Sequence, residues 1–236
     1  MFSSVQAGFL SFSEKFEGSV AFMYLDVKGL VTVGVGNLID PVALAQALPF
    51  RFKNRPGIAT PGAAATQDQI ATEWQTLKSN PDLGRKGFRA CDPVTELELS
   101  DDSIGSLILG RLGDNETFLK RQPWFKDFDA WPADAQLGLL SMAWAMGPAG
   151  PGDFPHFRAA CQSQDFNTAA AECKMSEAGI GGSLIERNKA NFALFSNAAA
   201  VIAGEGQGKL QRATLYYPRV LTAADGDLAS STASTE

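Results

Sequence analysis

Histidine and cysteine are scarce in this chain of 236 residues, which has one histidine, His156, and three cysteines. No spacing of these residues is typical of a zinc site, so we expect no metal and no cofactor. His156 lies in a proline-rich loop without a nucleophile-elbow motif, which argues against a Ser-His-Asp or Cys-His hydrolase. Cys161 and Cys173 are close enough in sequence to pair in an oxidising periplasm, but we favour three reduced, buried thiols, with Cys91 as the third.

The sequence also lacks long apolar runs. None approaches the roughly 20 residues that span a bilayer, so we expect no membrane span. The N-terminal residues, Met-Phe-Ser-Ser, have neither the basic patch nor the apolar segment of a secretory signal peptide. A protein made in the cytoplasm that acts beyond it therefore needs another route. A holin, a secretion apparatus or release from a longer parent protein would each serve.

An excess of basic residues is missing as well. The formal net charge is −6, and no basic stripe is present that could neutralise phosphates, which argues against a nucleic-acid partner. The apolar fraction of 45% is typical of globular proteins. At this length the chain can bury a core that folds alone, as one large domain or two modest lobes.

The most informative segment spans residues 17–37. Apolar residues recur at helical spacing before Glu17, at Val5, Phe9, Phe12 and Phe16, and Gly18 follows as a natural helix stop. We therefore expect the Glu17 carboxyl at the C-terminal end of a helix, in apolar surroundings. Both the burial and the helix dipole would disfavour its ionised form, as a general acid requires.

A β-hairpin is predicted directly after Glu17. Residues 20–25 and 30–35 are rich in aromatic and β-branched side chains, and Asp26 and a Lys-Gly pair separate them. Asp26 then lies at the tip, and Thr32 lies on the returning strand beside glycines that leave room for a substrate. Asp before such a turn is more often a turn-former than a catalyst. Two carboxylates held apart by a hairpin are nevertheless the minimal equipment for cleaving a glycosidic bond.

The joint pattern resembles the phage-type lysozymes, the muramidase family of the T-even bacteriophage enzyme. The family's Glu, the Asp nine positions on and the Thr six further fall on Glu17, Asp26 and Thr32, with Gly-x-Gly following. Residues 135–154 resemble the family's central buried helix and the loop after it. Arg187 falls where the family has an arginine that contacts the catalytic Glu.

The resemblance implies an α+β, mostly helical, two-lobed lysozyme-like fold, with a glycan cleft between a small hairpin lobe and a larger helical lobe. The expected catalytic domain is 1–221, with the small lobe at about 14–100 and the helical lobe at about 1–13 and 115–221. Residues 49–97 have no good counterpart and are expected to be an insertion. Residues 222–236, which are rich in Ser, Thr and Ala, are expected to form a disordered tail.

The resemblance also implies an activity: hydrolysis of the β-1,4 bond between N-acetylmuramic acid and N-acetylglucosamine in bacterial peptidoglycan. Glu17 would protonate the leaving oxygen, Asp26 with Thr32 would activate water, and Arg187 would orient Glu17. Gly36 and Asn37 are expected to contact substrate, although the family usually has His where Asn37 stands. Ala145 likewise replaces a polar Gln that faces substrate.

Two other activities remain open, a lytic transglycosylase that leaves 1,6-anhydro ends and a non-catalytic peptidoglycan-binding module. Both a phage endolysin and an antibacterial effector fit the residues. The missing signal and the acidic charge favour the effector, delivered to the periplasmic wall by a secretion system, and an immunity protein would then be a partner. We expect a monomer.

Other patterns predict the remaining elements. Thr66 begins a capped helix that runs to about residue 78, Ser100 caps a connecting helix, and a buried helix is expected at 134–146. A short helix is expected after Pro41, and further helices at 154–161, 166–175 and 183–203. Residues 51–65 and 80–94 are predicted to be irregular. The second of these carries the one local basic cluster, Arg85, Lys86 and Arg89, which is either a solvated loop, the interpretation we favour, or a contact for a polysaccharide or an anionic stem peptide.

Overall fold

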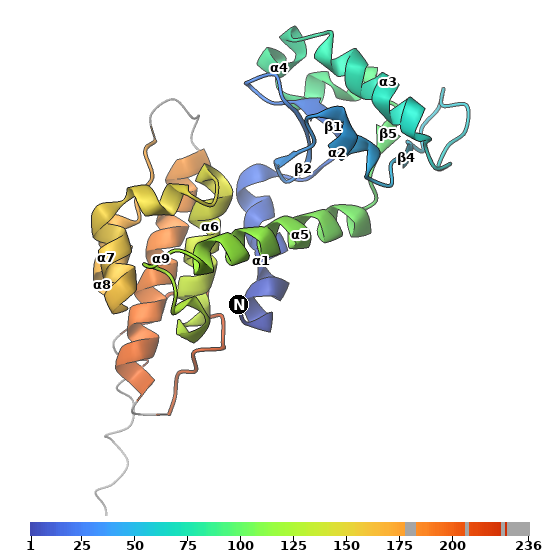
Figure 1. The fold of residues 1–236 in the computed structure, drawn as a ribbon. Helices are drawn as coiled ribbons and strands as arrows, with labels where there is room; N and C mark the ends of the chain where they lie inside the picture. Colours follow the sequence, from blue (N-terminus) through green and yellow to red (C-terminus); the bar gives the residue numbers. More distant parts are fainter. Residues whose placement is uncertain (178–182, 206–207, 223–224, 226–236) are drawn as a thin grey trace, which may run out of the picture. The chain divides into compact units, whose positions relative to one another are not determined.

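The computed structural model describes residues 1–177, 183–205, 208–222 and 225, and the expected tail lies largely outside these residues. The fold is α+β and mostly helical, with small antiparallel sheets (Figure 1). Two compact units divide the chain: a helical unit, Met1–Phe16 with Arg111–Glu236, and a hairpin unit, Glu17–Gly110. Among the described residues, no helix combines the length and apolarity that crossing a membrane requires.

The helical unit is built around one buried helix. Every residue from 133 to 144 is buried in α6 (Ala133–Met146), which confirms the predicted core helix. Helix α9 (Ser183–Gly204) packs against α6 and against α8 (Phe166–Glu172), which in turn packs on α7 (Pro155–Ser163). Aromatic side chains fill the space between these helices, among them Phe125, Trp131, Phe157, Phe166 and Phe195. The short 3-10 helices Phe128–Ala130 and Gly150–Asp153 flank α6.

One boundary in this unit differs from the sequence prediction. Helix α8 ends at Glu172 rather than near residue 175. Both backbone groups of Met175 are hydrogen-bonded to the side chain of Asn188, with its amide donating to Oδ1 and its carbonyl accepting from Nδ2, each at 2.9 Å. Helical hydrogen bonding cannot continue through a residue whose backbone is used in this way.

A buried carboxylate fixes the C-terminal segment to the core helix. Asp134, in the first turn of α6, is fully buried and accepts hydrogen bonds from the amides of Tyr216 and Tyr217 and from Nδ2 of Asn197, at 2.8–3.0 Å. Burial raises the pKa of the Asp134 carboxyl, and the three donors oppose that rise. The segment after α9 is thereby held by hydrogen bonds as well as by apolar packing.

The hairpin unit contains a three-stranded antiparallel sheet, β1 (Val20–Leu25), β2 (Val31–Gly34) and β3 (Asn37–Leu38), in that order. The predicted hairpin is confirmed. Tyr24 lies opposite Thr32 and Leu25 opposite Val31, with an irregularity in register toward Val20. Helix α1 (Ser3–Glu17) precedes the sheet and ends where the sequence predicted.

Several helices follow this sheet in the chain. They are α2 (Val42–Gln46), α3 (Gln67–Lys78), α4 (Asp82–Lys86), the 3-10 helices Phe88–Ala90 and Asp92–Val94, and α5 (Asp101–Lys120), which continues into the helical unit. Helix α3 begins with the predicted cap, because Thr66 and Gln69 form a reciprocal capping box. Ser100 likewise accepts a hydrogen bond from the Ser103 amide at the start of α5.

Residues 49–97, the expected insertion, begin and end at the same small sheet. Strand β4 (Arg51–Phe52) pairs with β5 (Leu97–Glu98), so the two ends of the segment lie side by side. The Leu99 amide then donates to the Ala21 carbonyl at 2.8 Å, which ties this sheet to β1. Strands of two residues carry no detectable alternation, so neither strand could be predicted from the sequence.

Candidate functional site

The turn of the hairpin is organised by the carboxylate of Asp26. Its Oδ1 accepts hydrogen bonds from the amides of Lys28 at 2.8 Å and Leu30 at 2.9 Å. The Gly29 amide donates to the Asp26 carbonyl at 2.9 Å, and Gly29 has φ +74°, a conformation that favours glycine. Asp26 is therefore a turn-former, as the conservative interpretation of the sequence held.

The same geometry leaves half of the Asp26 carboxylate unused. Within the described part of the chain, Oδ2 accepts no hydrogen bond, and the side chain is partly exposed. Two backbone amides fix the orientation of the group through one oxygen, while the other oxygen can accept a hydrogen bond from water or a ligand. Turn formation and chemistry are thus compatible at this residue.

Thr32 is held close to the same turn. It is 5% exposed, lies opposite Tyr24 on one side and Leu38 on the other, and its Oγ1 donates to the Leu30 carbonyl at 3.2 Å. Leu30 therefore contacts both predicted residues, through its amide with Asp26 and through its carbonyl with Thr32. The structure brings these two residues to one point of the hairpin.

Glu17 is exposed, so its expected apolar surroundings are not observed. The apolar residues at helical spacing, Val5, Phe9 and Phe12, are buried on one face of α1. Glu17 follows Phe16 by one position, a rotation of about 100° around the helix axis, and leaves that face. Helical spacing predicts that a residue belongs to a helix. Whether its side chain is buried depends on its angular position around the helix axis relative to the apolar residues.

Gly36 and Asn37 lie at the other end of the sheet from the Asp26 turn. A Cβ at Gly36 would lie 3.9 Å from Oε2 of Glu17, so the absence of a side chain there leaves space beside that carboxyl. Asn37 is 2% exposed, and its Oδ1 is buried without a hydrogen-bond partner among the described residues. Glu17 precedes β1 and Asp26 follows it, so the two carboxyls flank one strand.

Arg187, in α9, is buried inside the helical unit. Its Nη1 lies 3.4 Å from both the carbonyl and the hydroxyl oxygen of Ser141, and its guanidinium lies 4.6 Å from the ring centroid of Phe16. Phe16 is the residue immediately before Glu17 in α1. Arg187 therefore contacts the neighbour of the predicted acid.

Two contacts with residues 49–97 support the hairpin turn, and neither was predicted from the sequence. The first involves Lys78, the last residue of α3, which donates from Nζ to the Gly29 carbonyl at 2.9 Å and forms an ion pair with Asp40 at 2.8 Å. Asp40 also accepts from the Val31 amide at 3.3 Å. These bonds join α3 to both sides of the turn.

The second contact is a close approach at Gly84 in α4. A Cβ at this position would lie only 2.5 Å from the Asp26 carbonyl oxygen and 3.3 Å from Cβ of Leu25. Only glycine fits there without moving the backbone. Nearby, the ring of Phe88 meets that of Tyr24, edge to face, with centroids 6.1 Å apart.

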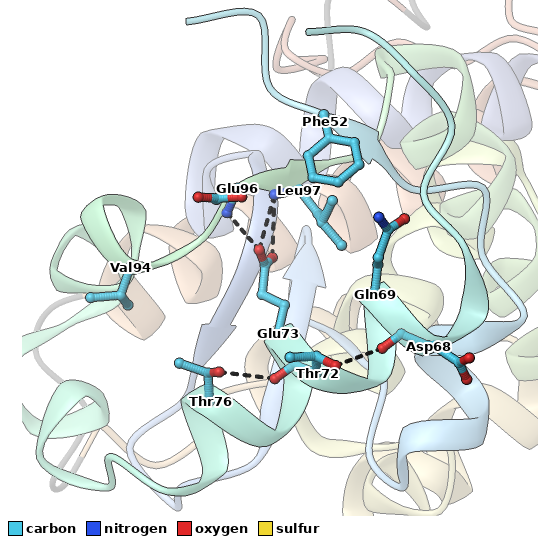
Figure 2. Close-up of a pocket in the computed structure, with 9 residues that line it drawn as sticks. All are labelled: Phe52, Asp68, Gln69, Thr72, Glu73, Thr76, Val94, Glu96 and Leu97. Carbon is cyan, nitrogen blue, oxygen red and sulfur yellow. Dashed lines mark hydrogen bonds between the residues drawn. The ribbon is translucent and has the colours of Figure 1, made fainter. Parts of the chain in front are cut away.

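A separate cavity of about 410 Å³ lies beside α3, and Figure 2 shows its lining. Glu73 is 8% exposed, and its Oε2 accepts from the amides of Glu96 at 2.5 Å and Leu97 at 3.1 Å (Figure 2). Burial raises the pKa of the Glu73 carboxyl to about 7, although the backbone donors and the charge of Lys53 act in the opposite direction. The spacing of Ile70, Glu73 and Leu77 could have placed Glu73 on the buried face.

The cysteines offer no nucleophile. All three are buried and free, as the favoured interpretation held. Burial raises the pKa of Cys91, raises that of Cys161 well above its ordinary value, and raises that of Cys173 to about 12. The thiols are therefore protonated at neutral pH and unreactive.

Comparison with known proteins gives no family assignment. No family model matches the chain. Over 72 residues the chain is 33% identical to a DNA ligase from Methylorubrum extorquens. The matched stretch covers 29% of this chain and 9% of the ligase, so it includes only a small part of either protein.

We expect Gly84→Ala to disturb the Asp26 turn, because the added methyl group would overlap the Asp26 carbonyl. The substitution should lower the free energy of unfolding by about 1–3 kcal/mol and accelerate amide hydrogen exchange at Lys28 and Leu30. Gly105→Ala is the control, because a Cβ there meets open space within α5 and should be neutral or stabilising. Unchanged exchange at both amides in Gly84→Ala would contradict the contact.

Glu73 should make stability depend on pH. Its folded pKa of about 7 lies above the unfolded value of 4.5, so its contribution is full below pH 4.5 and is lost as pH rises toward 7. Over that window the free energy of unfolding should fall by up to about 3 kcal/mol because of this group. Glu73→Gln should remove that dependence in urea titrations, whereas Glu96→Gln, at an exposed neighbour, should keep most of it, because burial is the larger cause of the raised pKa. Identical pH profiles for wild type and Glu73→Gln would refute the assignment.

Proposed function

We propose that this chain is a peptidoglycan muramidase that hydrolyses the β-1,4 bond between N-acetylmuramic acid and N-acetylglucosamine. One observation supports the proposal most strongly: the orientation of the Asp26 carboxylate. Two backbone amides orient this group through Oδ1, and its Oδ2 accepts no hydrogen bond from the described residues. A fixed, partly exposed carboxylate is suited to hold a water and to accept its proton.

In this proposal Glu17 is the general acid. It stands at the end of α1, is exposed, and faces a position without a side chain at Gly36, where a sugar ring can approach the backbone. Glu17 would protonate the oxygen of the departing sugar while water attacks from the opposite face. Arg187 would orient Glu17, and its contact with Phe16, the residue before Glu17, supports a positioning role.

Asp26 and Thr32 would together hold the attacking water. The Thr32 hydroxyl donates to the Leu30 carbonyl and keeps lone pairs that can accept a hydrogen bond from water. An inverting mechanism requires a gap of roughly 6.5–9.5 Å between the two carboxyls, which leaves room for this water. The mostly helical α+β fold in two compact units agrees with the lysozyme-like, two-lobed architecture that we propose.

The partial similarity to a DNA ligase does not favour a nucleic-acid enzyme. It covers 9% of the ligase, and this chain has a net charge of −6. An acidic protein lacks the long-range attraction that draws enzymes to a polyanion. The sugar backbone of a glycan strand carries no phosphates and has no such requirement.

Substitution of the two carboxyls tests the proposal. Glu17→Gln and Asp26→Asn should each lower the release of reducing ends from purified peptidoglycan about 100-fold or more, because each removes one proton-transfer group. In Asp26→Asn the amide oxygen of the new side chain can keep both backbone hydrogen bonds, so thermal unfolding should change little. Glu14→Gln, at an exposed position of α1, is the matched control and should retain full activity.

Retention of wall hydrolysis by Glu17→Gln would overturn the assignment of the acid. Near-wild-type turnover by Asp26→Asn would instead indicate an enzyme with a single acid, as in a lytic transglycosylase, with 1,6-anhydro products that mass spectrometry detects.

A further inference from the structure

The hairpin turn carries a neighbouring segment that the proposed hydrolysis does not use. Residues 82–91, which we call the basic arm, comprise α4 and the 3-10 helix after it. Three of its residues contact the end of β1: Gly84 packs on Asp26, Phe88 meets Tyr24, and the Cys91 thiol is hydrogen-bonded to the backbone of Leu25. The basic arm is therefore built onto the Asp26 turn.

The charges of the basic arm are not neutralised. Arg85, Lys86 and Arg89 are exposed, and Lys28 is exposed in the adjoining turn. Among the described residues, Lys86 and Arg89 have no carboxylate within 4 Å, and Arg85 meets only Asp82, in a solvent-exposed pair at 3.4 Å.

Three other cations of the hairpin unit lie in ion pairs, whereas Arg51, on β4, is exposed. Lys53 and Arg55 are paired with Asp92, and Lys78 is paired with Asp40. In a chain with a net charge of −6, four free or weakly paired cations around one turn of the described structure form a local site for anions.

An apolar group accompanies these charges. Phe88 is 41% exposed, and the Arg89 guanidinium lies 5.8 Å from the centroid of its ring. One edge of the ring is fixed by Tyr24, so an aromatic surface is held beside the cations at little conformational cost. Carboxylates and short aliphatic side chains on one flexible ligand would match this surface.

We propose that the basic arm binds the carboxylate-bearing peptide substituent of the glycan strand. This inference rests on the proposed function, because a strand cleaved at Asp26 would carry its peptide on the muramic acid ring, close to the scissile bond. A group attached to the reacting sugar is necessarily held beside Asp26, where the basic arm lies. Phosphate-bearing wall polymers are the competing anions, and the experiment includes them.

The experiment measures binding without turnover. Soluble glycan fragments of equal length are titrated calorimetrically into the full chain carrying Glu17→Gln, in three forms: with peptide, with the peptide carboxylates amidated, and without peptide. A wall phosphate polymer is titrated in parallel. The triple variant Arg85→Gln, Lys86→Gln, Arg89→Gln is compared with this parent. Arg51→Gln, at an exposed cation of β4, is the matched control.

The triple variant should bind peptide-bearing fragments about tenfold more weakly than the parent, as expected when a few exposed ion pairs are lost. Its affinity for amidated and peptide-free fragments should be unchanged. The parent's preference for peptide-bearing fragments should shrink as salt is raised from about 0.05 to 0.2 M. Arg51→Gln should behave like the parent.

Equal weakening for all three fragments would overturn the inference, as would no weakening for any of them or no binding by the parent. Loss of binding to a wall phosphate polymer, with peptide-bearing fragments unaffected, would overturn it in favour of that polymer. Hydrolysis by the wild-type chain is scored separately. Charge-dependent binding without hydrolysis would support peptide binding by the basic arm and refute the muramidase activity. Hydrolysis without charge-dependent binding would support the muramidase activity and refute peptide binding by the basic arm.

Discussion

The site depends on one interaction, the acceptance of two backbone hydrogen bonds by a single oxygen of Asp26. The amides of Lys28 and Leu30 close the hairpin turn through Oδ1, and this fixes the plane of the carboxylate. Thr32 is then positioned through the Leu30 carbonyl. A carboxylate oriented by the backbone needs no further side chain to hold it, so its second oxygen can accept a hydrogen bond from water or a ligand.

Residues 49–97 give this turn a support that a hairpin of two strands lacks. Lys78 bonds to the Gly29 carbonyl from α3, and Gly84 packs directly on the Asp26 carbonyl from α4. Strand β4 lies near the start of the segment and β5 lies at its end. Because these two strands pair, the two ends of the segment lie side by side. The segment thereby supports the candidate site and adds a basic surface beside it.

Local patterns in the sequence were sufficient to predict the elements that carry the site. The spacing of Phe9 and Phe12 predicted α1, and the residues around Asp26 predicted the hairpin. The Gly84 and Lys78 contacts could not be predicted, because each joins residues about 50–60 positions apart and leaves no local signal. The apolar surroundings predicted for Glu17 were wrong, because Glu17 lies about 100° around the helix axis from Phe16 and so falls outside the buried face of α1. The burial of Glu73 could be predicted from the sequence, because Glu73 lies at helical spacing between the apolar residues Ile70 and Leu77.

In the proposed mechanism, Asp26 delivers a water to the sugar while Glu17 protonates the leaving oxygen. The most direct measurement is proton NMR of the anomeric centre during the first minutes of hydrolysis of a defined, peptide-bearing glycan fragment. Attack of water opposite the leaving group predicts that the α-anomer forms first and then mutarotates. A first product with the β-configuration, or one with a 1,6-anhydro ring, would contradict this account.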